Sequence, residues 1–223
     1  MSLPSDAAAK PALTAAALPL VAITCWESLY ERAAVQPGEF VLIHGGAGGT
    51  GHVAVQLAAL RGARVAATVS SPAKARIATD FGAELPINYR EMNFADEVLG
   101  WSGGLQVAFD NAGAEVMQST YRAMAPYGRV VTLMGVAEDD AELNAYNLNL
   151  TLHNVMMLTP MWKGLTERLK AQATIVSKAL QLVASGKLKI LLSESFALAD
   201  ADKAHAHLES GKALGKVTLR ING

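Results

Sequence analysis

The stretch EFVLIHGGAGGTG, residues 39–51, decides how this chain folds. Its first part, Glu39 to His44, is a short and almost continuously apolar run, which is typical of a buried strand. Five glycines follow at once, between Gly45 and Gly51. Residues 52–60 then carry apolar side chains at helical spacing. The glycine-rich segment therefore lies between a predicted strand and a predicted helix.

The pattern Gly46-x-Gly48-x-x-Gly51 gives this segment a chemical interpretation. The first glycine permits a tight turn, the second lets the backbone approach a pyrophosphate, and the third lets the helix pack close to the strand. Free N–H groups and the dipole at the helix start stabilise the anion. The pattern predicts a dinucleotide site, and the alternative is a glycine-rich turn without a ligand. A phosphate-transfer loop is excluded, because His52 and Val53 stand where Lys and Ser/Thr are required.

The same alternation of strand and helix repeats along the chain. Apolar strands that alternate with helices predict a doubly wound α/β fold with a parallel six-stranded Rossmann sheet. The predicted strands are residues 39–44, 64–69, 85–88, 106–110, 129–134 and 154–158. A long helix over 164–185 follows, and then a short C-terminal α/β extension of strand 191–196, helix 200–209 and strand 216–221. We expect a flexible lead-in at 1–15, a dinucleotide-binding domain at 16–190 and the extension at 191–223.

Composition limits the function. Lys+Arg (19) and Asp+Glu (20) nearly balance in a chain of 223 residues, so a strongly basic nucleic-acid binder is disfavoured. A single cysteine, Cys25, excludes an internal disulfide framework and multi-cysteine zinc patterns, which favours a cytoplasmic protein. The apolar stretch 13–25 is interrupted by Pro19 and is shorter than the roughly 20 residues that a bilayer needs. We expect it to start a soluble helix and expect no membrane partner.

Cofactor choice is predicted at the end of the second strand, about 20 residues past the loop, where NAD-binding domains place an acid on the ribose. Ser70, Ser71 and Lys74 occupy this region instead. The hydroxyls can donate hydrogen bonds to a 2′-phosphate and Lys74 supplies a positive charge, so the sequence predicts NADP(H). In the alternative interpretation, Ser70 only caps the next helix and Lys74 is a solvated surface lysine.

Other chemistries lack their residues. The five histidines show no metal-ligand spacing, and no Gly-x-Ser-x-Gly elbow of a hydrolase occurs. Asp110-Asn111-Ala112-Gly113 is similar to a segment of short-chain reductases, but the Tyr-x-x-x-Lys of that family is absent. We therefore name no catalytic residue and expect no metal.

Several motifs in the same order along the chain resemble those of the medium-chain dehydrogenase/reductase superfamily. The similarity is greatest to its quinone oxidoreductase-like and zinc-type alcohol dehydrogenase-like members. The motifs are HGGAGGTG at 44–51, Ser70-Ser71-x-x-Lys74, GAE at 82–84 before INYR at 87–90, FDNAG at 109–113 and ESGKALGKVTL at 209–219.

The resemblance implies roles for individual residues. The pyrophosphate would face the loop residues Gly46, Ala47, Gly48, Gly49, Thr50 and Gly51. The 2′-phosphate end of the adenosine would face Ser70, Ser71, Lys74 and Tyr89. The nicotinamide half would face Asn111, Gly135 and Val136, with Met157 and Leu158 beside its ring. Local alternatives stay open, since Tyr89 can cap a strand, Asn111 can satisfy a turn and Met157 can fill the core.

The resemblance also implies a function and a partner. The chain would be the NADPH-binding domain of an oxidoreductase that transfers a hydride between NADP(H) and a quinone, enone or carbonyl/alcohol substrate. It would lack the N-terminal catalytic domain, to which residues from about Leu191 return in relatives, and an exposed apolar patch would result. The alternatives are a stand-alone cofactor-binding module with little or no activity and an interaction protein that has lost the ligand. A homodimer is expected through an edge strand at Val155–Leu158, so a charge at Val155 should yield monomers.

Overall fold

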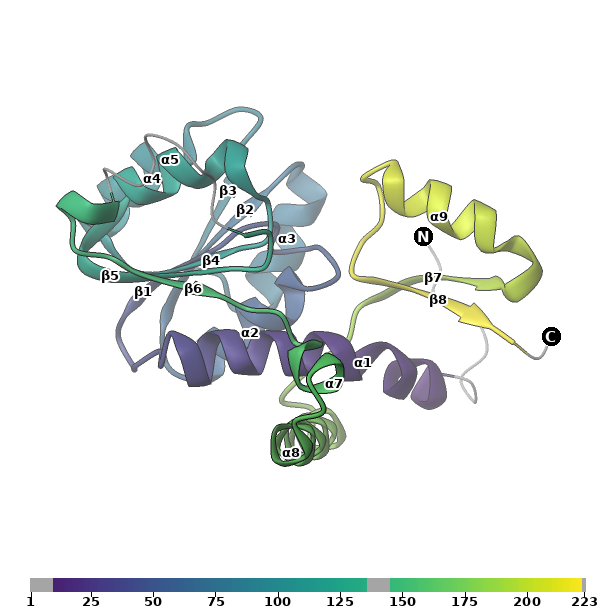
Figure 1. Ribbon diagram of the computed structural model, residues 1–223. Helices are drawn as coiled ribbons and strands as arrows, with labels where there is room; N and C mark the ends of the chain where they lie inside the picture. Colours follow the sequence, from purple (N-terminus) through teal and green to yellow (C-terminus); the bar gives the residue numbers. More distant parts are fainter. Residues whose placement is uncertain (1–9, 136–144, 222–223) are drawn as a thin grey trace.

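The computed structural model describes residues 10–135 and 145–221. Its centre is a six-stranded sheet in the order β3-β2-β1-β4-β5-β6, and every neighbouring pair of strands is parallel (Figure 1). The strands are β1 (Phe40–Ile43), β2 (Arg64–Val69), β3 (Leu85–Asn88), β4 (Leu105–Asp110), β5 (Met124–Thr132) and β6 (Thr151–Asn154). The predicted doubly wound Rossmann sheet is confirmed.

Two separate apolar clusters cover the two faces of this sheet. Neighbouring strand residues point to opposite faces, so Val41 and Ile43 enter one cluster and Leu42 enters the other. The first cluster packs under α1 (Lys10–Trp26), α2 (Gly51–Leu60), α3 (Pro72–Asp80) and α8 (Thr166–Ala184). The second packs under α4 (Phe94–Ser102) and α5 (Ala114–Arg122). Burial on both faces is the reason why these strands are apolar throughout.

The N-terminal helix is longer than the sequence suggests. Helix α1 begins at Lys10, so residues 10–15 are helical rather than part of a lead-in, and Pro19 lies inside the helix without ending it. A π-helical turn, η1 (Glu27–Arg32), continues it. The stretch Pro11–Arg32 is long and apolar enough for a membrane span. However, Leu18, Val21 and Cys25 are fully buried in the core cluster over the sheet, as in a helix that covers a soluble domain.

The last strand of the sheet differs from the prediction. Strand β6 covers Thr151–Asn154 and forms one edge of the sheet, whereas most of the apolar run 154–158 lies beyond it. Val155 is only 8% exposed and packs in the core, and its N–H donates to the Thr132 carbonyl at 3.0 Å. The predicted edge strand at Val155–Leu158 is therefore wrong, and a charge at Val155 would disturb the core rather than a dimer edge.

A second, smaller sheet follows the long helix α8. Strands β7 (Leu192–Ala197) and β8 (Lys216–Arg220) pair in parallel, and η2 (Leu198–Asp200) and α9 (Ala201–Glu209) connect them. This C-terminal lobe stands beside the carboxyl-terminal side of the main sheet (Figure 1). It exposes large apolar side chains, including Leu198 at 51% and Ile221 at 79%. The division of the chain into domains at about Leu191 stays a prediction.

Candidate functional site

The predicted cofactor residues that the structure describes all follow the carboxyl ends of strands in one sheet. Because all six strands are parallel, these ends meet at one edge. The glycine loop follows β1, and Asn111 follows β4. Ser70, Ser71 and Lys74 come after β2, Tyr89 after β3, Gly135 after β5, and Met157 and Leu158 after β6. Val136 lies outside the described residues.

The strand order arranges these residues in a row. From the β3 edge inward, Tyr89 comes first, the serines and Lys74 second, and the glycine loop third. Asn111, Gly135 and Met157 continue the row on the other side. The strand order reverses between β1 and β4, which is where doubly wound sheets bind their ligands. The row has the order of an extended dinucleotide, with adenosine, pyrophosphate and a second base.

Close backbone approaches explain the glycines of the loop. A Cβ on Gly51 would overlap the Gly45 carbonyl, and a Cβ on Gly46 would lie 2.6 Å from the Cβ of Ala67. The Gly48 N–H donates to the Gly45 carbonyl at 2.8 Å, which closes the turn. Asn111 lies against this turn, with its Oδ1 3.4 Å from the position of a Cβ on Gly45. The loop and the β4 end therefore form one continuous surface.

The start of α2 offers donors for an anion. Thr50 precedes the helix without a side-chain cap, and the first turn has no acidic residue. Among the described residues, the N–H groups of Gly49 and Thr50 have no hydrogen-bond acceptor. Unpaired N–H groups and the helix dipole attract a negative charge at such a position.

The end of β2 shows which serine caps the next helix. Ser71 is the N-cap of α3, and its Oγ accepts a hydrogen bond from the Lys74 N–H at 3.3 Å. Ser70 is thus not the cap that the alternative interpretation assumed. The Lys74 Nζ donates to the Gly211 carbonyl at 2.8 Å, so this lysine also reaches the loop before β8. Tyr89 is 51% exposed, and its N–H donates to the Val69 carbonyl at 3.1 Å.

A buried polar network holds the β4 end in shape. Asp110 Oδ1 accepts from the N–H groups of Ala112 and Gly113 at 2.9 and 3.0 Å, and its Oδ2 accepts from the Thr132 hydroxyl at 2.7 Å. Behind the loop, both ring nitrogens of His44 lie within 3.3 Å of a threonine hydroxyl. Burial lowers the pKa of His44 to about 4, so its ring is neutral. These groups shape the site and face no open space.

Lys216 on β8 is a site residue that the sequence does not reveal. Its Nζ lies 3.7 Å from the position of a Cβ on Gly49, and the Gly215 N–H donates to the Ala47 carbonyl at 3.0 Å. The lysine therefore brings a cation to the glycine loop from a distant part of the chain. Burial lowers its pKa. No local pattern near residue 216 could have indicated this contact, because only the tertiary fold creates it.

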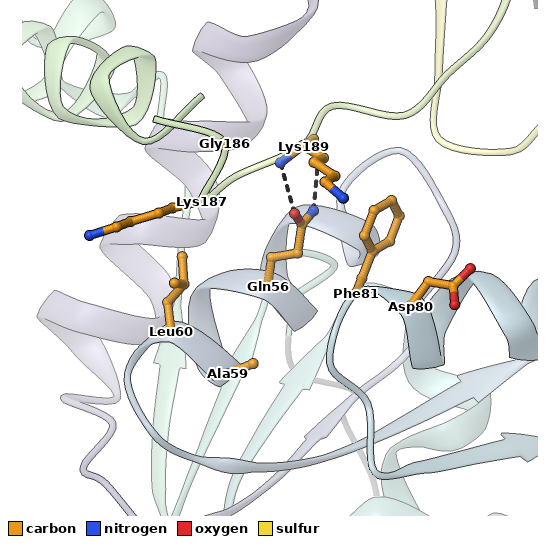
Figure 2. Close-up of a pocket in the computed structure, with 8 residues that line it drawn as sticks. All are labelled: Gln56, Ala59, Leu60, Asp80, Phe81, Gly186, Lys187 and Lys189. Carbon is orange, nitrogen blue, oxygen red and sulfur yellow. Dashed lines mark hydrogen bonds between the residues drawn. The ribbon is translucent and has the colours of Figure 1, made fainter. Parts of the chain in front are cut away.

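A shallow pocket of about 290 Å³ lies elsewhere, on the outer side of α2 (Figure 2). It is lined by Gln56, Ala59, Leu60, Asp80, Phe81, Gly186, Lys187 and Lys189. None of the predicted cofactor residues contributes to it. The pocket is therefore separate from the row of residues at the strand ends.

Metal ligands do not gather among the residues described here. No group of three His, Cys, Asp or Glu side chains in residues 10–135 and 145–221 is arranged to hold a metal ion. Zinc therefore has no donor set in this part of the chain, and no chemical step is derived through it.

Comparisons with known proteins agree with this geometry. Quinone oxidoreductase-like protein 2 of Bos taurus is 32% identical over 211 residues, which are 93% of this chain and 60% of that protein. A polyketide synthase subunit of Mycobacterium tuberculosis, named for phenolphthiocerol and phthiocerol, is 32% identical over 201 residues, 89% of this chain and 9% of that protein. The chain thus spans about 60% of the quinone oxidoreductase relative and a small part of the synthase.

Solved structures show the same fold. A zinc-dependent alcohol dehydrogenase-type protein from Rhizobium etli has a TM-score of 0.86 and 30% identity, with 95% of this chain and 64% of that chain covered. A mycobacterial protein complexed with NADPH has a TM-score of 0.81 and 27% identity, with 98% and 66% covered.

The profile of the family described as zinc-binding dehydrogenase matches residues 81–219, which is well over half of the chain. With the resemblance in the glycine loop and the strand ends, this match assigns the sequence. The chain belongs to the zinc-binding dehydrogenase family of the medium-chain dehydrogenase/reductase superfamily.

Proposed function

We propose that this chain binds NADP(H) along the carboxyl edge of its sheet and forms the nucleotide-binding part of a reductase. The observation that carries the proposal is the row from Tyr89 to Met157, with unpaired amides at its centre. The relative solved with NADPH, which has the same fold, supports it. The substrate would be a quinone, enone or carbonyl compound, in keeping with the names of the relatives.

Each part of the row would hold one part of the cofactor. The amides of Gly49 and Thr50 would bind the pyrophosphate, with Lys216 as its neighbouring cation. Ser70, Ser71 and Lys74 would bind the 2′-phosphate, and Asn111 would position the nicotinamide half. When bound, the cofactor supplies the hydride; the chain contributes orientation and exclusion of water.

The choice between NADPH and NADH depends on Lys74 in this proposal. Replacement by Ala removes the ammonium from the 2′-phosphate, so the Kd for NADPH should rise about 10- to 100-fold, while the Kd for NADH changes less than about 2-fold. Fluorescence titration of both cofactors measures the two constants. Lys170→Ala, a loss of the same charge on α8, is the matched control and should alter neither. Equal losses for NADPH and NADH would contradict a 2′-phosphate role for Lys74.

Turnover is a separate question from binding. Because about a third or more of each relative's length lies outside the match, the substrate half of those enzymes has no counterpart among the aligned residues. This favours, as a second candidate, a cofactor-binding module with little or no turnover. Steady-state NADPH oxidation with a small quinone separates the two, and the absence of any NADPH binding would leave an interaction protein. We expect this protein in the cytoplasm.

We also propose a homodimer, now through β6 as the free edge of the sheet. The Val155 N–H points to β5, so by alternation the N–H of Asn154 points outward. Asn154→Pro removes that outward donor without removing a bond to β5. We expect monomers in sedimentation velocity, with an unchanged far-UV spectrum. Exposed Thr159→Ala, beyond the edge, is the control; an unchanged dimer in Asn154→Pro would refute pairing through β6.

A further inference from the structure

We propose that His52 is a positioning residue of the dinucleotide site, which holds the glycine loop with one ring nitrogen and the linker to the C-terminal lobe with the other. The inference rests on the proposed function, because it concerns how the pyrophosphate loop is kept in its binding shape. It concerns a side chain that faces the core rather than the ligand.

The hydrogen bonds of His52 fix its tautomer. The Leu191 N–H donates to His52 Nε2 at 3.1 Å, so Nε2 carries no proton. Nδ1 must then carry the proton of the neutral ring, and it donates to the Gly48 carbonyl at 2.8 Å. The side chain is fully buried, so both nitrogens are used and neither bond competes with water.

The bond to Gly48 sets the direction of a neighbouring amide. In a trans peptide, the carbonyl of one residue and the N–H of the next point in opposite directions. Holding the Gly48 carbonyl against the ring therefore directs the Gly49 N–H away from it. This N–H is one of the two unpaired donors at the start of α2. His52 thus acts on the anion site through the peptide plane and does not touch the ligand.

The bond to Leu191 ties the C-terminal lobe to the same ring. Leu191 precedes β7, and its carbonyl accepts from the Lys216 N–H of β8 at 2.7 Å. One turn along α2, Gln56 holds the linker a second time: its amide nitrogen donates to the Lys189 carbonyl at 2.9 Å, and its oxygen accepts from the Lys189 N–H at 2.8 Å (Figure 2). Gln56 contacts the linker but not the loop, so the two side chains can be tested against each other.

The surroundings keep the ring neutral. Phe81 packs beside it, with ring centroids 5.8 Å apart, and Lys216 is the charged group that acts on it. Burial, opposed by the bond to Gly48 and assisted by Lys216, lowers the pKa of His52 to about 4. A protonated ring would place a second donor opposite the Leu191 N–H, so the linker bond requires the neutral form.

Two substitutions separate the two nitrogens. The amide of an asparagine can occupy the place of Nδ1, and the amide of a glutamine can occupy that of Nε2. His52→Asn should keep the Kd for NADPH within about 3-fold, and His52→Gln should raise it about 10-fold, the loss of one hydrogen bond. The Leu191 amide should exchange hydrogen about 10-fold faster in His52→Asn and should keep its protection in His52→Gln. Gln56→Ala is the matched control, with faster exchange at Lys189 and an unchanged Kd.

The outcomes distinguish this inference from the proposed function. If the wild-type chain binds no NADPH, the proposed function fails, but ¹⁵N spectra of the His52 ring and Leu191 exchange still test the connector. If the wild type binds NADPH and the Asn and Gln variants lose affinity and protection equally, His52 only stabilises the fold and the inference is overturned. A ring protonated on Nε2 in the wild type would overturn it as well.

Discussion

Gly51→Ala is expected to destabilise the chain by about 3 kcal/mol and to weaken NADPH binding at least about 10-fold. The added Cβ would overlap the Gly45 carbonyl, which is backbone and has no rotamer to escape. Either α2 or the loop must therefore move, and the amides of Gly49 and Thr50 move with them. Thermal unfolding should show a Tm lower by about 6–12 °C for a chain of this size.

Gly100→Ala makes the same chemical change in a place where it should help. Gly100 lies in α4, and a Cβ there meets no atom within 4 Å. Because alanine has less conformational freedom to lose, this variant should be more stable by about 0.5–1 kcal/mol with unchanged cofactor affinity. If both variants had the same effect on Tm, the close packing of the loop against α2 would not be what requires a glycine at 51.

Acid should destabilise this protein well before its carboxylates titrate fully, because two histidines are buried in the neutral form. Burial lowers the pKa of both His44 and His52 from 6.5 to about 4. Between these values the unfolded chain binds protons that the folded chain refuses. The free energy of unfolding therefore falls as the pH falls from 6.5 to about 4, with a slope of about 1.4 kcal/mol per pH unit for each histidine.

Urea unfolding across this pH range measures the slope. His52→Gln removes one of the two groups, so its slope should be about 1.4 kcal/mol per pH unit smaller than that of the wild type. The exposed His205 on α9 is the matched control, and His205→Gln should keep the wild-type slope. A wild-type stability that does not change across the window would mean that these rings are protonated in the folded state.

Most elements of the sheet follow from local pattern. Strands β1, β2, β3 and β4 lie within about two residues of their predicted positions, because strands that are buried on both faces are apolar throughout and bounded by turns. The positions of the site residues follow too, since each was predicted immediately after a strand.

The errors occur where local pattern and tertiary role diverge. An edge strand needs only one partner, so the partly polar Thr151–Asn154 can pair with β5 while the apolar Val155 enters the core as loop. Pro19 should interrupt a helix by its own chemistry, yet α1 continues through it. Packing of Leu18, Val21 and Cys25 against the core outweighs the lost hydrogen bond.

The sequence by itself determined the β-loop-α unit, the doubly wound sheet and the row of residues at its carboxyl edge. These depend on interactions between residues close in the chain, whose spacing is visible as periodicity. Only the tertiary structure decided that Lys216 reaches Gly49, that Lys74 reaches Gly211 and that His52 joins Gly48 to Leu191. The last three contacts cross more than a hundred residues in each case but one, and such pairs leave no periodic trace, because their partners meet only after the C-terminal lobe has packed beside the glycine loop.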